Sequence, residues 1–467
     1  MSVIGQDLGS LRAGLSATAA VCVPGDEGYD EAVRIWNASV DRRPSIVVRC
    51  ASDGDVVAAL VFAQRESLEV SVRGGGHNYA GFALTDGGLM IDLTPMKTVT
   101  VDADARTAKC GGGTTWGELD AATQGHGLAV TGGFVSTTGV AGLTLGGGIG
   151  WLVRAAGLSC DNLVAARVVT ADGRVLTADA EVNPDLFWAI RGGGGNFGVV
   201  TEFEFALHAV GPMVQFALFL FSPDQGGDLF RFARDYVRDL PADCGVLLAG
   251  LSAPSAPFVP AELHFQPAYG LLVVGLGDEA SHARLIAPIS QALEPMVQMV
   301  TPIPYAGLQQ MFDESAPWGM HSYEKAVYLD ELTDGAIEVI LEHQGKKMSP
   351  LSFVPIFVLG GRYGATDPDS SAFGGGRGIG YVVNISATTP SPDDLPAERE
   401  WVRNYWSALV PHAVGVGSYV NFMTDPDPER IRNTYGDKYT RLQQVKATYD
   451  PNNVFHLNAN IQPAVST

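Results

Sequence analysis

The sequence lacks the short motifs that mark several large enzyme classes. Its 467 residues contain no CxxC pair, no GxSxG element, no HExxH motif and no glycine-rich loop ending in the Lys-Ser or Lys-Thr of a P-loop. These absences exclude the usual signatures of zinc sites, serine hydrolases and P-loop nucleotide binding. Only five cysteines are present, at positions 22, 50, 110, 160 and 244. Such a sparse, odd set without regular spacing predicts reduced thiols and a cytoplasmic protein, with no metal site.

Basic charge and long apolar runs are also scarce. Charged residues make up 17% of the chain, and 51 acidic against 30 basic side chains give a net charge of −21. Nucleic acids and anionic membranes need clustered Lys and Arg, so neither is an expected partner. Near the N-terminus, Asp7 and Arg12 interrupt short apolar stretches, which predicts neither a signal peptide nor a membrane span. We expect a monomer or a homodimer whose partners are small molecules.

Apolar residues and glycine are abundant. A hydrophobic fraction of 46% predicts a well-buried globular protein, and 467 residues exceed the size at which a single core stops growing. The 56 glycines are concentrated before residue 200. After about residue 211, apolar strand-like runs are separated by helix-like segments. We therefore expect a first domain over 1–210, a sheet-plus-helix second domain over 211–400, and a segment over 401–467 that completes the first.

Hydrophobic periodicity and capping residues predict the main elements. In the first domain, strands are expected over 46–48, 68–72, 89–93, 98–101 and 199–207, helices over 53–67, 116–126 and 184–190, and a hairpin over 162–177. In the second domain, strands are expected over 216–221, 270–274 and 354–359, with helices over 225–240, 280–293 and 334–345. Helices over 397–409 and 439–449 follow.

A run of three glycines, Gly74–Gly76, lies between Arg73 and His77 at the end of a predicted strand. Consecutive glycines let the backbone turn tightly and bring its N–H groups against a ligand. With Arg73 beside them, these donors suit a pyrophosphate, and His77 would reach whatever the pyrophosphate carries. The competing interpretation is an ordinary surface turn with an incidental histidine.

Two further glycine-rich loops occur, over 142–150 and 192–198. The second contains a literal GxGxxG, but it follows a predicted helix and opens a strand. A dinucleotide-binding Rossmann site requires the reverse order, so that interpretation fails. Each loop alone is typical of a structural turn, whereas three of them within so short a stretch indicate one extended ligand.

These residues together resemble a known family. Arg73-Gly74-Gly75-Gly76-His77 is similar to the flavin-attachment motif of the FAD-linked oxidases of the vanillyl-alcohol oxidase/berberine-bridge-enzyme superfamily. The similarity continues through 91–93, 139–150, 157–162, 185–200, 419–422 and 441–453, so it covers roughly 40–210 and 400–462. Within the superfamily it is strongest to the bacterial branch with a single flavin link, which includes 6-hydroxynicotine oxidase and an enterocin-pathway flavoenzyme.

The resemblance implies an α+β fold. A PCMH-type FAD-binding domain of two α/β subdomains would hold the cofactor, and an inserted α/β domain, an antiparallel sheet covered by helices, would bind substrate. It also implies FAD linked once, through His77, by its 8α-methyl group. The other implied FAD-binding positions are Arg73, Gly74, Gly75, Gly76, Asn78, Thr137, Thr138, Gly139, Gly142, Ile149, Val199, Tyr419 and Asn421.

This sequence also departs from the family pattern. Members with two flavin links carry a cysteine where Val135 stands here, and we interpret Cys160 as a buried, inert thiol. The tyrosine that many members use as a general base is replaced by Phe422. The strand that supplies a pocket acid in some relatives reads Phe353-Val354-Pro355. The general base is thus unassigned, and the candidates are Tyr419, Tyr323, His321 and Lys325, with His321 and Tyr323 placed at a polar-aromatic loop, 315–321.

The resemblance implies an oxidase in which a substrate C–H bond gives a hydride to the flavin and O₂ then accepts the electrons, forming H₂O₂. Thr138 aligns with the position that controls oxygen entry in the family, and a threonine would leave room for O₂. The apolar strand 353–357, Phe422, Trp318 and Met320 favour a hydrophobic, aromatic secondary metabolite over a sugar. Other hypotheses remain: a sugar or alcohol oxidase, a flavin-dependent cyclase or oxygenase of a polyketide pathway, or a non-catalytic flavin-binding protein.

Overall fold

The first sheet is built around the strand that carries the triglycine turn. The computed structural model describes residues 8–415 and 417–465. In it, β1 (Ala20–Cys22), β2 (Ile46–Arg49), β4 (Leu89–Asp92) and β3 (Val70–Arg73) form a four-stranded sheet in that order, with β4 parallel to both β2 and β3. Helix α3 (Asp53–Arg65) follows β2 because the Ser52 side chain accepts a hydrogen bond from the Asp55 N–H. Two short helices, α1 (Leu8–Ala13) and α2 (Tyr29–Ala32), complete this part.

A second sheet of the first domain is antiparallel. Its order is β5 (Val99–Asp102), β6 (Thr107–Gly111), β10 (Val199–Ala206), β8 (Leu163–Val169) and β9 (Val175–Asp179). The hairpin predicted around residues 171–173 is confirmed as β8 and β9. Strands β7 (Leu128–Ala129) and β11 (His208–Ala209) form a separate pair. The helices here are α4 (Trp116–Gln124), α5 (Val140–Leu145), α6 (Val153–Ala156) and α7 (Pro184–Ile190).

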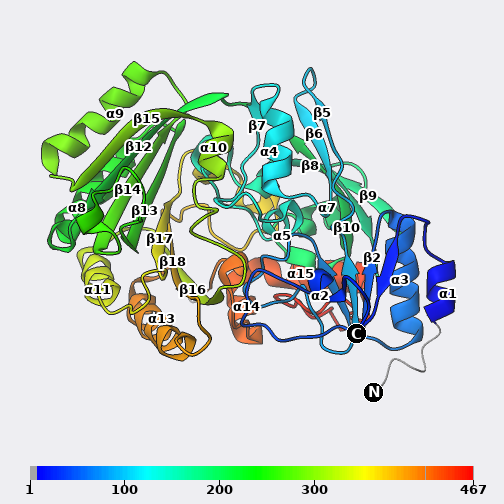
Figure 1. Cartoon of the computed structure of the whole chain (residues 1–467). Helices are drawn as coiled ribbons and strands as arrows, with labels where there is room; N and C mark the ends of the chain where they lie inside the picture. Colours follow the sequence, from blue (N-terminus) through cyan, green and yellow to red (C-terminus); the bar gives the residue numbers. More distant parts are fainter. Residues whose placement is uncertain (1–7, 416, 466–467) are drawn as a thin grey trace.

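A seven-stranded antiparallel sheet follows in the sequence. Its order is β15 (Val297–Pro304), β12 (Met213–Phe221), β14 (Pro267–Gly275), β13 (Cys244–Ser252), β17 (Val354–Val358), β18 (Tyr381–Thr389) and β16 (His321–Leu329). Helices α8 (Gly226–Tyr236), α9 (Glu279–Ala292), α11 (Asp334–Gln344) and α13 (Leu395–Leu409) cover its outer face (Figure 1). The remaining helices are α10 (Tyr305–Gln309), α12 (Arg362–Ala365), α14 (Pro428–Tyr435) and α15 (Tyr439–Tyr449).

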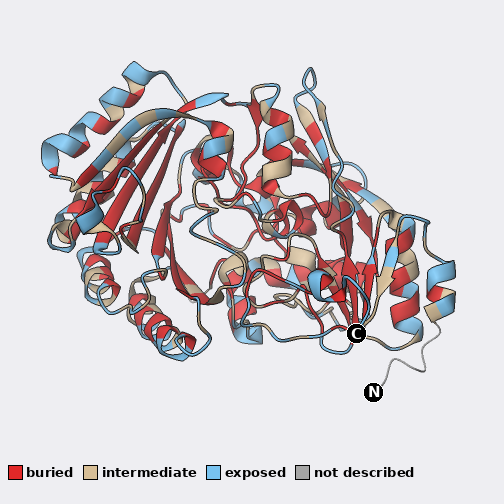
Figure 2. Cartoon of the chain, in the orientation of Figure 1, coloured by how far each residue is buried: buried red, intermediate tan, exposed pale blue. Residues whose placement is uncertain are grey.

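The two faces of the large sheet belong to different hydrophobic cores. On one face, Tyr323 and Val327 of β16 pack with Val402 and Tyr405 of α13. On the other, Ala326 and Tyr328 of the same strand pack with residues of the first domain, among them Ile149 and Trp151. Figure 2 shows the strands of this sheet buried along most of their length. The sheet therefore presents one face to the helices and the other to the predicted flavin site.

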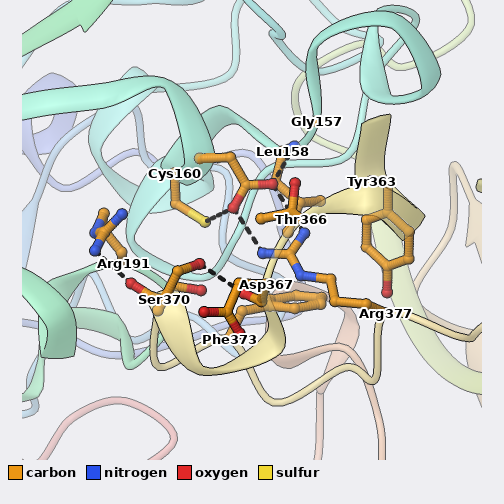
Figure 3. A network of polar contacts seen from close by, with 12 residues as sticks. Gly157, Leu158, Cys160, Arg191, Tyr363, Thr366, Asp367, Ser370, Phe373 and Arg377 are labelled. Carbon is orange, nitrogen blue, oxygen red and sulfur yellow. Dashed lines mark hydrogen bonds and ion pairs between the residues drawn. The ribbon is translucent and has the colours of Figure 1, made fainter. Parts of the chain in front are cut away.

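A buried ion pair joins the first domain to the segment after β17 (Figure 3). The Arg377 guanidinium donates hydrogen bonds of 2.8 and 2.6 Å to the two carboxylate oxygens of Asp161. The Arg377 side chain also lies over the rings of Tyr363 and Phe373. Such two-pronged pairing fixes orientation as well as distance, so it holds the 157–162 segment against the second domain.

Most predicted elements are confirmed, and the mixed α+β architecture with an antiparallel second-domain sheet is confirmed as well. Strands β6, β13, β15 and β18 were not predicted. The placement of His321 and Tyr323 at a loop is wrong, because β16 begins at His321 and runs through Tyr323. The domain boundaries at 210 and 400 stay predictions.

All five cysteines are free, and Cys160 is fully buried. Within residues 8–415 and 417–465, no helix combines the length and the apolar character that crossing a membrane would require.

Candidate cofactor site and active site

The triglycine turn touches a second glycine loop through its backbone. A Cβ atom added to Gly75 would lie 2.3 Å from the Gly139 nitrogen, and one added to Gly139 would lie 2.4 Å from the Gly75 nitrogen. No side chain fits at such distances, so both positions require glycine. By contrast, a Cβ added to Gly142 meets nothing within 4 Å. Gly74–Gly76 and Gly139–Gly142 thus form a cradle with open space along one side.

Arg73 ends β3 and begins this cradle as a buried cation. Its side chain is in no salt bridge of the described part of the chain, and its Nε has no hydrogen-bond partner there. One of its terminal nitrogens donates to the Ala32 carbonyl, and burial lowers the pKa of the guanidinium. Asp92 opposes this shift but forms no ion pair with Arg73. A buried guanidinium outside an ion pair is costly, so this one is suited to an anionic ligand such as a pyrophosphate.

Three buried hydroxyls around the same loops, those of Ser71, Thr114 and Thr144, likewise have no partner within the residues that the structure describes. Buried polar groups are nearly always hydrogen-bonded in a folded protein. These free groups, the buried arginine and the glycine cradle therefore fit FAD along the path that the sequence predicts.

His77 lies at the end of the cradle between two tryptophans. Its ring stacks on Trp36 at 6.0 Å between centroids and meets the edge of Trp318 at 5.4 Å. Burial lowers the pKa of the imidazole to about 4, so the ring is neutral at physiological pH. The His77 Nε2 is 2.9 Å from the Thr137 hydroxyl, whereas Nδ1 has no hydrogen-bond partner within the described ranges.

Tyr419 holds the third side of the site. Its hydroxyl accepts hydrogen bonds from the Gly148 N–H at 2.8 Å and the Ile149 N–H at 3.3 Å. The Asn421 amide also donates to this hydroxyl, at 2.8 Å, and to the Leu143 carbonyl. Burial raises the pKa of Tyr419. A neutral phenol with three donors aimed at its oxygen is suited to fixing the 146–149 turn, and it is poorly suited to taking a proton.

Three other predicted cofactor positions, Val199, Thr138 and Asn78, can be located in the structure. Val199 is buried at the start of β10, Thr138 is half-buried beside Gly139, and the Asn78 carbonyl oxygen accepts from the Phe82 N–H. The Asn78 acceptor is its side-chain Oδ1, while its backbone carbonyl accepts from the Gly81 N–H. The contacts of these residues with FAD stay predictions.

Two candidate bases, Tyr323 and Lys325, lie on the helix-covered face of β16. The Tyr323 hydroxyl donates to Asp425 at 2.6 Å and accepts from Arg403 at 3.2 Å. The Lys325 ammonium lies 4.4 Å from the ring centre of Trp406 on α13, and burial lowers its pKa to about 8. The third, His321, is at the strand's first residue, 3.4 Å from the Ser39 hydroxyl. The structure does not bring these three to Tyr419.

A carboxylate that the sequence analysis missed lies on the opposite face of the same strand. Glu324 is fully buried between Tyr323 and Lys325 in the sequence, and strand alternation turns it the other way. Two polar residues of β18, Asn384 and Ser386, lie beside it. The alternation of residues 321–329 was the available signal.

An aromatic cluster lies on the same face as Glu324, over β17, which β18 separates from β16. Phe357 of β17 lies 4.9 Å from Phe134 and 5.6 Å from Phe422 between ring centroids, and Phe134 lies 4.9 Å from Trp151. A cavity of about 10 Å³, the size of one water molecule, remains among them. This face of the sheet therefore combines an apolar part with a polar edge.

Comparison with known proteins identifies the family to which the chain belongs. Residues 44–179 match the FAD binding domain family and residues 418–462 match the berberine and berberine-like family. The chain is 30% identical to (R)-6-hydroxynicotine oxidase of Paenarthrobacter nicotinovorans, over 96% of this chain and 98% of that protein. It is 33% identical to an uncharacterized FAD-linked oxidoreductase of Bacillus subtilis, over 96% and 97%. The crystal structure of 6-hydroxy-D-nicotine oxidase from Arthrobacter nicotinovorans superposes with a TM-score of 0.85 at 28% identity, over 96% and 99%.

The fold, the glycine cradle and the two matched families together identify the protein as an FAD-dependent oxidoreductase. The chain belongs to the berberine-bridge-enzyme-like family of FAD-linked oxidoreductases, because full-length relatives share 30% or more of its residues. The resemblance to this family and to 6-hydroxynicotine oxidase is thereby confirmed, whereas that to the enterocin-pathway flavoenzyme stays a prediction.

Proposed function

We propose that the protein is an oxidase that carries FAD on His77 alone and oxidises a small aromatic metabolite, passing the electrons to O₂ with release of H₂O₂. The observation that carries this proposal is the position of His77, a neutral imidazole at the end of a glycine cradle and between two tryptophans. A neutral ring nitrogen keeps the lone pair that bonding to the 8α carbon requires.

The free nitrogen of His77 indicates where that bond would form. Nε2 is engaged with the Thr137 hydroxyl, which leaves Nδ1 as the atom for the flavin bond. A second link is not proposed, since Val135 replaces the cysteine and Cys160 is fully buried, with burial raising the pKa of its thiol.

Bound at this site, FAD supplies the acceptor for the hydride that leaves a substrate C–H bond. The chain's own groups hold and orient the cofactor. Arg73 and the backbone of the cradle would bind the pyrophosphate, while Tyr419 and Asn421 fix the 146–149 turn and Ile149 with it. The aromatic cluster would exclude water from the face where substrate binds.

The same cluster supports an aromatic substrate. Apolar surface buried against Phe357, Phe422 and Phe134 would contribute about 25 cal/mol per Å². Each sugar hydroxyl left without a partner there would cost about 1–3 kcal/mol. One relative is named for 6-hydroxynicotine, which agrees with an aromatic compound carrying a hydroxyl or an amine.

A panel of substrates tests the proposed class. Aromatic alcohols, phenols and amines are compared with mono- and oligosaccharides, and peroxide release is measured with each. We expect turnover of at least one aromatic compound, whereas efficient oxidation of sugars alone would contradict the proposal.

Thr138 offers a test of the oxidase assignment that needs no substrate. Replacing Thr138 with leucine adds a larger side chain beside Gly139, so we expect photoreduced protein to react with O₂ about tenfold more slowly than wild type. Stopped-flow absorbance at 450 nm after mixing with aerated buffer measures this rate. Valine, nearly the same size as threonine, serves as the control. Wild-type reoxidation no faster than that of free flavin would contradict an oxidase.

A further inference from the structure

Strand β16 contributes to a cluster of polar side chains on the face of the sheet that is turned toward the first domain. Tyr323 packs with the helices, and Ala326 and Tyr328 pack with the first-domain core. Alternation therefore places Glu324 with Ala326 and Tyr328. In the register of β16 with β18, Glu324 lies opposite Ser386 and Ala326 lies opposite Asn384.

Glu324, Asn384 and Ser386 form a buried polar cluster in which several atoms have no hydrogen-bond partner among the described residues. The Asn384 amide donates to the Glu324 Oε2 at 2.9 Å. The Glu324 Oε1, the Asn384 Oδ1 and the Ser386 Oγ are all buried without a partner in the described part of the chain. Buried polar atoms are nearly always hydrogen-bonded in a folded protein, so three of them without a partner are suited to a polar ligand.

This polar cluster lies next to the segment that begins with His77. Tyr79, two residues after His77, lies beside these side chains: burial is the main cause that raises the pKa of its phenol, Glu324 adds to the rise, and the Ser386 side chain opposes it. The Tyr79 ring lies 4.8 Å from Trp36, which in turn stacks on His77. Tyr79 and Trp36 thus connect Glu324 with the predicted flavin attachment point.

We propose that Glu324 is the proton acceptor of the reaction, and that Asn384 and Ser386 hold the hydroxyl or amine of the substrate against it. This inference rests on the proposed function. For an alcohol, the O–H bond breaks and its proton goes to Glu324 Oε1. The C–H bond breaks as well, its hydrogen leaves with the bonding pair to oxidised FAD, and the C=O double bond forms.

Burial raises the pKa of Glu324 to about 8. About a tenth of the carboxyl groups are then ionised at pH 7 and about nine tenths at pH 9, so activity should rise about tenfold between those values. The facing groups are Tyr79 from the segment after β3, the uncharged Asn384 and Ser386 from β18, and Thr424, whose hydroxyl accepts from the Glu324 N–H. Lys325 and Asp425 belong to the other face of the strand.

The test uses phenol, which has no oxidisable C–H bond beside its hydroxyl and stays neutral between pH 6 and pH 9, with the oxidised flavoprotein. Binding is followed by the change in flavin absorbance. The ionised carboxylate accepts a hydrogen bond from the phenol more strongly than the protonated carboxyl group does, so we expect affinity about tenfold higher at pH 9 than at pH 6. In Glu324→Gln the affinity should be the same at both pH values and about tenfold lower than that of wild type at pH 9. In Ser386→Ala binding should weaken at both pH values while its dependence on pH stays. Glu338→Gln, an exposed change on α11, is the matched control.

The wild-type protein alone already decides the question if Glu324→Gln fails to fold. Absence of probe binding, or wild-type affinity that does not change between pH 6 and pH 9, overturns the inference. An equal rise in affinity in wild type and Glu324→Gln overturns it too. The probe requires no turnover and no O₂, so failure here is distinct from failure of the oxidase proposal, which the reoxidation rate decides.

Discussion

Replacing His77 with alanine is expected to give a protein that releases all of its flavin on acid precipitation, whereas the wild-type pellet stays yellow. Alanine has no nitrogen to bond the 8α carbon, while the glycine cradle and Arg73 remain to bind FAD without a covalent link. The resemblance to the family implies that the link raises the oxidising power of the flavin, so we expect turnover about tenfold lower. The flavin spectra of pellet and supernatant measure the attachment.

The matched control for this variant is Cys160→Ser. Cys160 is fully buried and its thiol lies 3.9 Å from Asp161, so its loss should leave attachment intact. Flavin that stays with denatured His77→Ala, or leaves denatured Cys160→Ser, would show that the link is misplaced.

Replacing Lys446 with methionine is expected to lower the free energy of unfolding by about 3–5 kcal/mol. The Lys446 ammonium and the Asp450 carboxylate are both fully buried and 2.7 Å apart. The ammonium also donates to the carbonyls of Asn196 and Phe455. Methionine keeps the apolar stem but leaves a buried carboxylate and two carbonyls without their donor. Urea titration followed by circular dichroism measures the loss.

Lys346→Met provides the comparison for Lys446. Lys346 pairs with Glu342 at the same spacing in the sequence and a distance of 2.7 Å, but both side chains are more than half exposed. Solvent-exposed pairs contribute about 0–1 kcal/mol, so this variant should be close to wild type. Equal effects of the two substitutions would contradict the assignment of Lys446 to a buried network.

Local signals explain why the first domain could be predicted from the sequence. The Ser52 cap, the proline at the start of α7 and the turn between β8 and β9 each act within a few residues. The triglycine turn could also be recognised from its own residues, although the contact that requires glycine at position 75 is with the distant Gly139. Resemblance to the family then supplied the fold and the cofactor, both confirmed.

Glu324 could not be identified in the same way, because its role depends on which face of a strand it occupies. The sequence pattern predicted a loop over 315–321 and favoured Tyr323 and Lys325, whose side chains point to the helices. The predicted substrate class rested on the apolar strand 353–357, Phe422, Trp318 and Met320, whereas the polar residues lie on β18 and β16. Register between strands far apart in the sequence is set by the whole sheet, and no short window contains it.

The third glycine loop depends on the last residues of the chain. The Asn196 amide donates to the Ala459 carbonyl, its carbonyl oxygen accepts from the Ile461 N–H, and its backbone carbonyl accepts from Lys446. On the ribosome, the residues of the first two glycine loops and of the whole large sheet are synthesised before these partners. FAD is therefore expected to enter, and to be bonded, only after residues 446–461 have been released from the exit tunnel. Ribosome-stalled chains ending near residue 415 should carry no covalent flavin.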